Sequence, residues 1–131
     1  MERFLQLVRP VLLLLLLAGA VYGQSGTIQG ILVDASGGAI PNAKITATDE
    51  AKKLLVRETV TQADGHFYLR NLLPGDYTVK GEAAGFKSIE RTQLKLDQNQ
   101  IMDLGTVTLQ VGATSESVTV EATGPVVETS T

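Results

Sequence analysis

Apolar and polar residues alternate with a period of two through most of the chain after residue 24. Ala43, Ile45 and Ala47, for example, fall on one face of their segment, and the residues between them are polar. Such alternation is typical of a β-strand with one buried and one solvated face. Turn residues separate seven segments of this kind: Thr27–Asp34, Ala43–Thr48, Leu54–Gln62, His66–Arg70, Tyr77–Ala83, Lys87–Leu96 and Ile101–Leu109. The regular spacing predicts an all-β fold, an antiparallel sandwich of about seven strands.

The alternation also assigns individual side chains to the interior or to solvent. Those predicted to point inward are Ile28, Gly30, Leu32, Phe67, Leu69, Tyr77 and Val79. Those predicted to point outward on the same strands include His66, Tyr68, Arg70 and Lys80. The segment Leu54–Gln62 carries Arg57 and Glu58 at its centre, so we interpret it as an edge strand.

Glycine and proline mark the turns between these strands. Asp64-Gly65 and Pro74-Gly75 each favour a tight reversal, and we expect Gly75 to supply a positive φ. Tyr77 follows the second turn and is predicted to plug the end of the sandwich while its hydroxyl stays in solvent.

The two ends of the chain differ from the central strands. Residues 1–23 contain two arginines and the apolar run Val11–Ala18, the pattern of a secretory signal peptide. Cleavage is expected after Ala20 or after Gly23, because small residues precede both sites. An uncleaved membrane anchor is the disfavoured alternative, since the apolar run is well short of the roughly 20 residues that span a bilayer.

After the sandwich, predicted over residues 24–110, the chain changes character. Ser115–Ala122 alternates once more, and the last residues are polar and acidic, so we interpret residues 111–131 as an extended strand and linker tail. The strand in this tail could add to an edge of the sandwich, in cis or in trans, or serve only as a connector. The sequence leaves this choice open.

Charge and cysteine content narrow the function classes. Removing residues 1–23 takes two of the 11 basic and one of the 14 acidic side chains, which leaves 9 and 13 and a net charge near −4. No face looks basic enough to bind nucleic acid. The chain has no cysteine, so the predicted exported domain must be stabilised by its core alone.

Five motifs then follow one another along the chain: Gly30-Ile31-Leu32-Val33-Asp34 with Ser36-Gly37, Ile40-Pro41-Asn42-Ala43-Lys44-Ile45, Ala63-Asp64-Gly65-His66-Phe67, Leu72-Leu73-Pro74-Gly75-Asp76-Tyr77-Thr78-Val79, and Ala83-Ala84-Gly85-Phe86-Lys87. This succession resembles the carboxypeptidase-regulatory-like domain over about Gln24–Leu109. The resemblance implies a transthyretin-like, Ig-like β-sandwich of the carbohydrate-binding-like fold. Two positions depart from the family pattern: Asn42 stands where Gly is common and tolerates a positive φ, and Gly81 replaces a branched aliphatic, leaving a gap or marking a bulge.

The stretch after Leu109, through Val118-Thr119-Val120 to Val126-Val127-Glu128, is similar to the connector of Oar-like TonB-dependent outer-membrane receptors. In those proteins such a domain precedes a plug and a barrel. The resemblance implies an exported location, in the periplasm or at the outer membrane or cell surface. It also implies a partner, either another protein or a receptor plug and barrel region that this sequence does not contain.

Catalytic chemistry finds little support among the residues. His66 is the single histidine, and without cysteine no set of zinc ligands is present, so we predict no catalytic residue, no metal site, no cofactor and no enzyme. Peptidase activity is not implied, because the resemblance is to the accessory sandwich and not to a catalytic domain. Calcium is a minor alternative, because carboxylates occur at turns, at Asp34, Asp49, Glu50, Asp64 and Asp76.

Two functions therefore stay open, and an enzyme of unrecognised type is the third and least favoured hypothesis. The preferred hypothesis is a non-catalytic, exported structural or interaction module, resembling the N-terminal extension of a TonB-dependent receptor. The alternative is a carbohydrate-binding accessory domain, for which Tyr68 is the one aromatic predicted to face solvent, with Arg70 and Lys80 expected nearby as ligand-binding residues.

Overall fold

The alternating segments form strands close to where the sequence predicts them. The computed structural model describes residues 2–6 and 25–122. Its strands are β1 (Gly26–Val33), β2 (Lys44–Asp49), β3 (Leu54–Val60), β4 (His66–Leu72), β5 (Gly75–Glu82), β6 (Ser88–Leu96), β7 (Ile101–Thr108) and β8 (Ser117–Glu121). The seven predicted segments match β1 to β7 to within about two residues at each end, within the usual uncertainty of strand boundaries.

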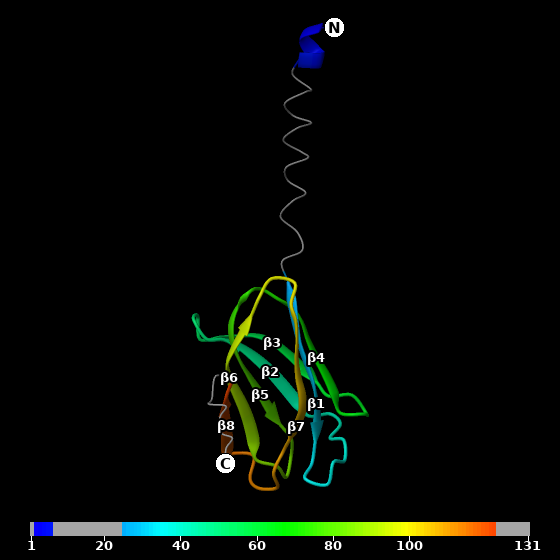
Figure 1. Cartoon of the computed structure of the whole chain (residues 1–131), viewed down its shortest axis with the longest axis vertical. Coiled ribbons are helices and arrows are strands. Elements are labelled where there is room, and N and C mark those ends of the chain that lie inside the picture. Colours follow the sequence, from blue (N-terminus) through cyan, green and yellow to red (C-terminus); the bar gives the residue numbers. More distant parts are fainter. Residues whose placement is uncertain (1, 7–24, 123–131) are drawn as a thin grey trace, which may run out of the picture.

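The strands are arranged in two stacked sheets (Figure 1). The three-stranded sheet has the order β4-β1-β7, and the five-stranded sheet has the order β3-β2-β5-β6-β8. The predicted antiparallel sandwich is confirmed, and so is the position of β3 at an edge. Two pairs, β1–β7 and β6–β8, are parallel, and in both a long stretch of chain separates the partners, as parallel pairing requires.

The strand predicted after the sandwich, in Ser115–Ala122, corresponds to β8 and pairs with β6. Val118 pairs with Ile89 and Val120 pairs with Arg91, in a parallel ladder with β6. The strand therefore extends the five-stranded sheet in cis, and it covers the edge that β6 would otherwise present.

The interior lies between the two sheets, where the inward-facing side chains meet. The large side chains predicted to point inward are confirmed there, each at most 4% exposed. The buried core is formed by Ile28, Leu32, Ile40, Ala43, Ile45, Ala47, Phe67, Leu69, Leu72, Tyr77, Val79, Leu94, Leu96, Val107 and Leu109. Each large apolar side chain buried in this way contributes about 1.5–3 kcal/mol, which stabilises a domain that lacks disulfides.

Gly81 is a gap in an inward row and not a bulge. It pairs regularly with Ile45 on one side and with Ile89 on the other. A Cβ added at Gly81 would lie 3.4 Å from a terminal carbon of each isoleucine. The two neighbouring side chains therefore lean into the space that the glycine leaves.

The turns agree with the sequence prediction at two positions and differ at a third. Gly65 and Asn42 have φ of 83° and 58°, as a left-handed turn residue requires. The expectation for Gly75 is wrong: it begins β5 and pairs with Leu96. A positive φ occurs instead at Asn71, at 58°, near the end of β4, where the pairing of β4 with β1 shifts register.

Tyr77 closes one end of the interior, but its hydroxyl is not in solvent as predicted. The side chain is 2% exposed, and its hydroxyl donates a hydrogen bond to the backbone carbonyl of Leu73. The short connection from β4 to β5 brings that carbonyl to the phenol, so a protein partner replaces water. Burial raises the pKa of the Tyr77 hydroxyl, and the nearby Asp49 carboxylate adds to the effect.

The predicted signal peptide lies largely outside the described residues, together with both predicted cleavage sites and the last nine residues of the chain. Within the described part, no helix has the length and apolar character needed to cross a membrane.

Candidate functional site

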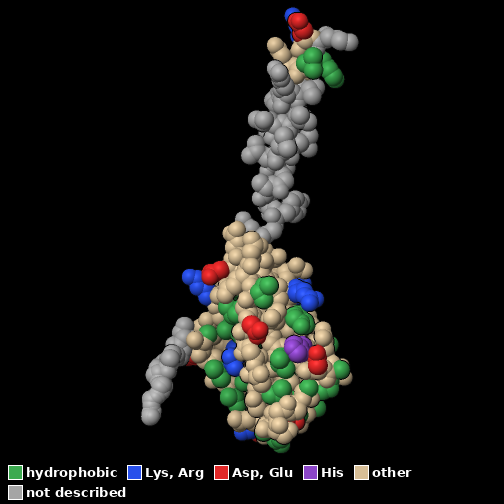
Figure 2. All heavy atoms as spheres, turned by 45° about the vertical axis from the view of Figure 1, so that its right-hand side comes forward, with side chains coloured by type: hydrophobic (Ala, Val, Ile, Leu, Met, Phe, Trp, Pro, Cys, Tyr) green, Lys and Arg blue, Asp and Glu red, His purple; other side chains and the backbone are tan. Residues whose placement is uncertain are grey.

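One candidate surface is the outer face of the three-stranded sheet, which we call the tyrosine face. It presents a hollow of about 210 Å³ lined by Gln29, Gly30, Ile31, His66, Tyr68, Asp103, Gly105 and Thr106. Figure 2 shows the histidine, in purple, among apolar side chains on this side of the molecule. The hollow forms because the alternation that buries Phe67 sends its neighbours His66 and Tyr68 outward.

The Tyr68 ring in this hollow already has neighbours. The guanidinium carbon of Arg70 lies 4.6 Å from the centroid of the ring, a cation–π contact. The His66 ring is nearly parallel to it, with 6.4 Å between the centroids and 15° between the planes. One face of the tyrosine is therefore covered by Arg70, which reduces the area available for stacking on a ligand.

His66 has a carboxylate neighbour that organises the turn before β4. Its Nδ1 lies 3.1 Å from Oδ2 of Asp64, and its backbone N–H donates to Oδ1 at 3.1 Å. The backbone hydrogen bond, followed by the side-chain contacts of His66, lowers the pKa of Asp64. Among the described residues, no three histidine or carboxylate side chains gather closely enough to hold a metal ion.

The structure does not bring Lys80 to the predicted ligand site. Tyr68 and Arg70 lie on β4 in the three-stranded sheet, whereas Lys80 lies on β5 in the other sheet. Each points away from the interior, so they occupy opposite faces of the sandwich. Lys80 instead forms an ion pair with Glu82 at 3.4 Å. The error arose because the alternation tells inside from outside but does not say in which sheet a strand lies.

Three of the turn carboxylates considered for calcium, Asp34, Asp49 and Asp64, accept local hydrogen bonds. Asp34 accepts from the backbone N–H groups of Ser36 and Gly38, both at 2.9 Å, and from the Ser36 hydroxyl at 2.6 Å. The Ser36 hydroxyl, together with these backbone groups, lowers the pKa of Asp34. Such bonding is the ordinary structural use of aspartate at a turn.

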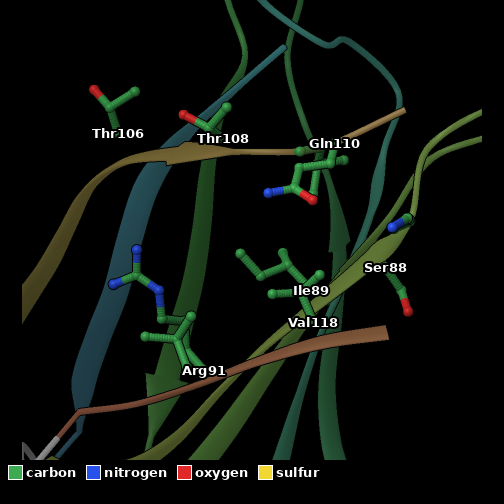
Figure 3. Close-up of a pocket in the computed structure, with 10 residues that line it drawn as sticks. Ser88, Ile89, Arg91, Thr106, Thr108, Gln110 and Val118 are labelled. Atoms are coloured by element: carbon green, nitrogen blue, oxygen red, sulfur yellow. The ribbon is translucent and has the colours of Figure 1, made fainter. Parts of the chain in front are cut away.

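A second candidate surface is a groove between the sheets, on the side where β7 faces β6 and β8. We call it the edge groove. It has a volume of about 300 Å³ and is lined by Lys87, Ser88, Ile89, Arg91, Thr106, Thr108, Leu109, Gln110, Val118 and Val120. In Figure 3 Ile89, Val118 and Arg91 rise from β6 and β8 toward β7, while Thr106 and Thr108 point away from the groove.

Arg91 in this groove lacks a protein partner. Its Nε is buried and has no hydrogen-bond partner, and no carboxylate in the described part of the chain lies within ion-pair distance of it. Arg57 provides the contrast, in a hollow of about 440 Å³ near Tyr77. There the guanidinium donates to the carbonyl of Asn71 at 3.1 Å. The other cation of the edge groove, Lys87, forms an ion pair with Glu116 at 3.5 Å, so of these three described cations Arg91 is the one without a partner.

The alternation of the sequence did not predict this groove. One feature of the sequence pointed to the groove: Arg91 follows Ile89 by two residues and therefore lies on the same face of the strand. A charged residue on the face of an apolar one predicts either an exposed edge or an incomplete interior. Locating the groove also required the pairing of β8 with β6, which the sequence left open.

Comparison with known proteins places the chain in a family. A model of the carboxypeptidase regulatory-like domain matches residues 27–110. The chain is also 32% identical, over 115 residues, to the TonB-dependent transporter Oar of Myxococcus xanthus. The matched region covers 87% of this chain but spans 11% of the transporter.

Solved structures share the sandwich at low sequence identity. A chain of a type II cohesin–X-dockerin complex from Acetivibrio cellulolyticus matches with a TM-score of 0.55 and 16% identity, over 66% of this chain and 58% of that one. A 3-chlorocatechol 1,2-dioxygenase from Rhodococcus opacus matches with a TM-score of 0.54 and 14% identity, over 70% and 61% of the two chains. At such identities the likeness concerns the fold alone, and one fold can host unrelated functions. From the match over residues 27–110, we conclude that this chain belongs to the carboxypeptidase regulatory-like domain family.

Proposed function

We propose that this chain is an exported, non-catalytic accessory module that docks or spaces other parts of a TonB-dependent transporter of the outer membrane. The observation that carries the proposal is the similarity to Oar over 115 residues, a longer stretch than the family model matches. The likeness therefore extends beyond the family domain. The signal-like pattern of residues 1–23 supports export.

A chimera tests the accessory role. The matched segment of the Myxococcus transporter is replaced by this chain, and the amount of transporter in the outer membrane is measured by immunoblotting. We expect an amount close to that of the native transporter. A matched chimera with Phe67→Asp, which places a charge in the core, should accumulate poorly because its module cannot fold. Equal amounts from the two chimeras would contradict a role for the folded module.

Export is tested separately. The chain is fused ahead of a reporter enzyme that is active only outside the cytoplasm, and the mature N-terminus is sequenced. We expect reporter activity and an N-terminus at Val21 or Gln24, following the two predicted cleavage sites. Leu14→Arg, which interrupts the apolar run, should abolish the activity. A protein that retains Met1 and stays in the cytoplasm would refute the export proposal.

Carbohydrate binding is the second candidate, and the hollow around Tyr68 favours it. A glycan array read with the wild-type protein and with Tyr68→Ala tests this role, since a stacking tyrosine cannot be replaced by a methyl group. Lys80→Ala is the matched control, because Lys80 lies on the opposite face and should leave any signal unchanged. A flat array for the wild-type protein would exclude this candidate for the sugars tested.

A further inference from the structure

The edge groove has one wall made of backbone. Leu109 donates its N–H to the carbonyl of Val33 at 2.8 Å, so its backbone faces β1. Backbone groups of successive strand residues point to opposite sides, which turns the N–H and C=O of Thr108 away from β1, and those of Thr106 likewise. Because β7 is the last strand of its sheet, these groups form a free edge to which another strand can bond.

The opposite wall is made of side chains in two adjoining pairs. Ile89 lies beside Val118, and Arg91 lies beside Val120, since these residues are partners in the β6–β8 ladder. The two pairs are two residues apart along each strand, about 6.6–6.8 Å. A strand bonded to β7 would direct side chains of the same spacing across the groove, one toward the apolar pair and the next toward Arg91.

The charge of Arg91 determines which side chain of an added strand is favoured at the position that faces it. Its Nε is already removed from water without a hydrogen-bond partner. A buried donor without a partner is costly, and a bond from a guanidinium to a carboxylate is stronger than one between neutral groups. A strand that covers the groove would remove Arg91 further from water, so an acidic residue at this position is strongly favoured.

We propose that the edge groove binds an extended segment of a partner protein that adds to β7 and carries an apolar residue and a carboxylate two positions apart. The apolar residue contacts Ile89 and Val118, and the carboxylate pairs with Arg91. This proposal rests on the interaction role proposed above and names the surface and the kind of partner. β8, which already adds to the neighbouring edge of the five-stranded sheet, shows that this side of the sandwich accepts strands.

A synthetic peptide tests the proposal in solution. The peptide Thr-Val-Thr-Glu-Thr-Val-Thr carries valine two positions from glutamate in both directions, so it suits parallel and antiparallel pairing. Its binding to the purified full chain is measured by isothermal titration calorimetry, beside a peptide with Gln in place of Glu. We expect the Glu peptide to bind about tenfold more tightly, as a charge-assisted hydrogen bond predicts.

Matched variants locate the peptide. Arg91→Gln should weaken the Glu peptide about tenfold and leave the Gln peptide nearly unchanged, whereas Arg57→Gln, at the other arginine-lined hollow, should change neither. Thr108→Pro should prevent binding, because it removes the outward N–H of the free edge. Its fold is checked by urea unfolding. A peptide N-methylated at alternate residues blocks the same bonds without altering the protein.

The results that would overturn the proposal are distinct from those that would refute the transporter role. Equal binding of the Glu and Gln peptides, full binding of the N-methylated peptide, or no binding at all would each refute this groove as a strand site. Binding that appears only in a Glu128→Gln variant would assign the groove to the end of the chain itself and overturn the partner proposal. None of these measurements depends on export or on the transporter chimera.

Discussion

The two lateral sides of the sandwich are finished in different ways. The side of β3 and β4 also has a hollow, of about 440 Å³, but there Val56 packs against the core and Arg57 donates to the carbonyl of Asn71, so the arginine is bonded within the domain. On the side of β7 and β8 a groove remains, and Arg91 points into it without a partner. We call the first side closed, because its arginine is bonded within the described chain, and the second side open, because Arg91 there has no partner among the described residues.

Chain connectivity explains the difference. β3 and β4 are joined by a short turn that passes from one sheet to the other, and Thr61 fixes its start: its hydroxyl donates to the carbonyl of Ile40 at 2.6 Å and accepts from the N–H of Ala43 at 2.9 Å. β8 also follows β7 after a short connection, but it bonds to β6 on the far sheet and does not approach the free edge of β7. The β3–β4 connection is thus fixed at its start, whereas the β7–β8 connection is held only from Gln110 onward, where the carbonyl of Gln110 accepts from the N–H of Lys87 at 2.7 Å, and the edge of β7 before Gln110 stays free.

The largest expected effect lies in the core between the sheets, at Phe67 on β4. The ring is 2% exposed and packs over Gly30, where an added Cβ would lie 2.8 Å from it. Phe67→Ala should lower the free energy of unfolding by about 3–5 kcal/mol, measured by urea denaturation. Leu104→Ala, at a half-buried position of β7, should cost roughly half as much or less. Equal losses would mean that these positions of β4 and β7 contribute equally to the packing of the core.

Thr61→Val tests the pinned connection. The substitution keeps the shape of the side chain but removes a buried hydroxyl that makes two hydrogen bonds, which leaves the carbonyl of Ile40 and the N–H of Ala43 without their partner. The free energy of unfolding should fall by about 2 kcal/mol. Thr59→Val, on β3 with no side-chain hydrogen bond among the described residues, is the matched control and should change it by less than about 0.5 kcal/mol.

The strands and their buried faces followed from the sequence because each depends on neighbouring residues. The alternation around Phe67 needs no knowledge of distant strands, and Asp64-Gly65 specifies its turn locally. The position of Lys80 relative to Tyr68 depends on sheet membership, which is decided by long-range pairing. For the same reason the sequence did not show that β8 pairs with β6, or that Arg91 would face a groove.

The hydroxyl of Tyr77 shows a smaller limit of the same kind. Its ring was correctly predicted to be buried, but its partner, the carbonyl of Leu73, depends on the exact path of the connection between β4 and β5. A sequence pattern can place a side chain inside without identifying the atom that its polar group will meet.

Tyr77→Phe tests how much this hydrogen bond stabilises the domain. Losing the hydrogen bond to Leu73 should lower the free energy of unfolding by about 1 kcal/mol at neutral pH, whereas Tyr68→Phe on the tyrosine face should have almost no effect.

The pKa of Tyr77 is raised from 10.0 by burial, so the folded state holds this proton more tightly than the unfolded state. Its contribution is therefore present below pH 10 and is lost as the pH rises further. The Phe variant should lose less stability than the wild-type protein above pH 10; an identical alkaline profile would contradict this.

Arg91→Leu is expected to have the smallest effect on the free energy of unfolding. The sign of the change shows whether Arg91 stabilises the isolated domain. On the closed side, removing a bonded polar group costs stability, whereas Arg91 has no partner to lose and its half-buried side chain is replaced by an apolar one. The free energy of unfolding should stay within about 0.5 kcal/mol of the wild-type value or rise slightly. Urea denaturation in the absence of peptide measures this change.

A loss above about 1 kcal/mol in the free energy of unfolding would show that Arg91 stabilises the isolated domain, and the groove would then have a structural role. Stability that is unchanged, together with loss of preference for the Glu peptide, would instead show an arginine retained for binding and not for folding.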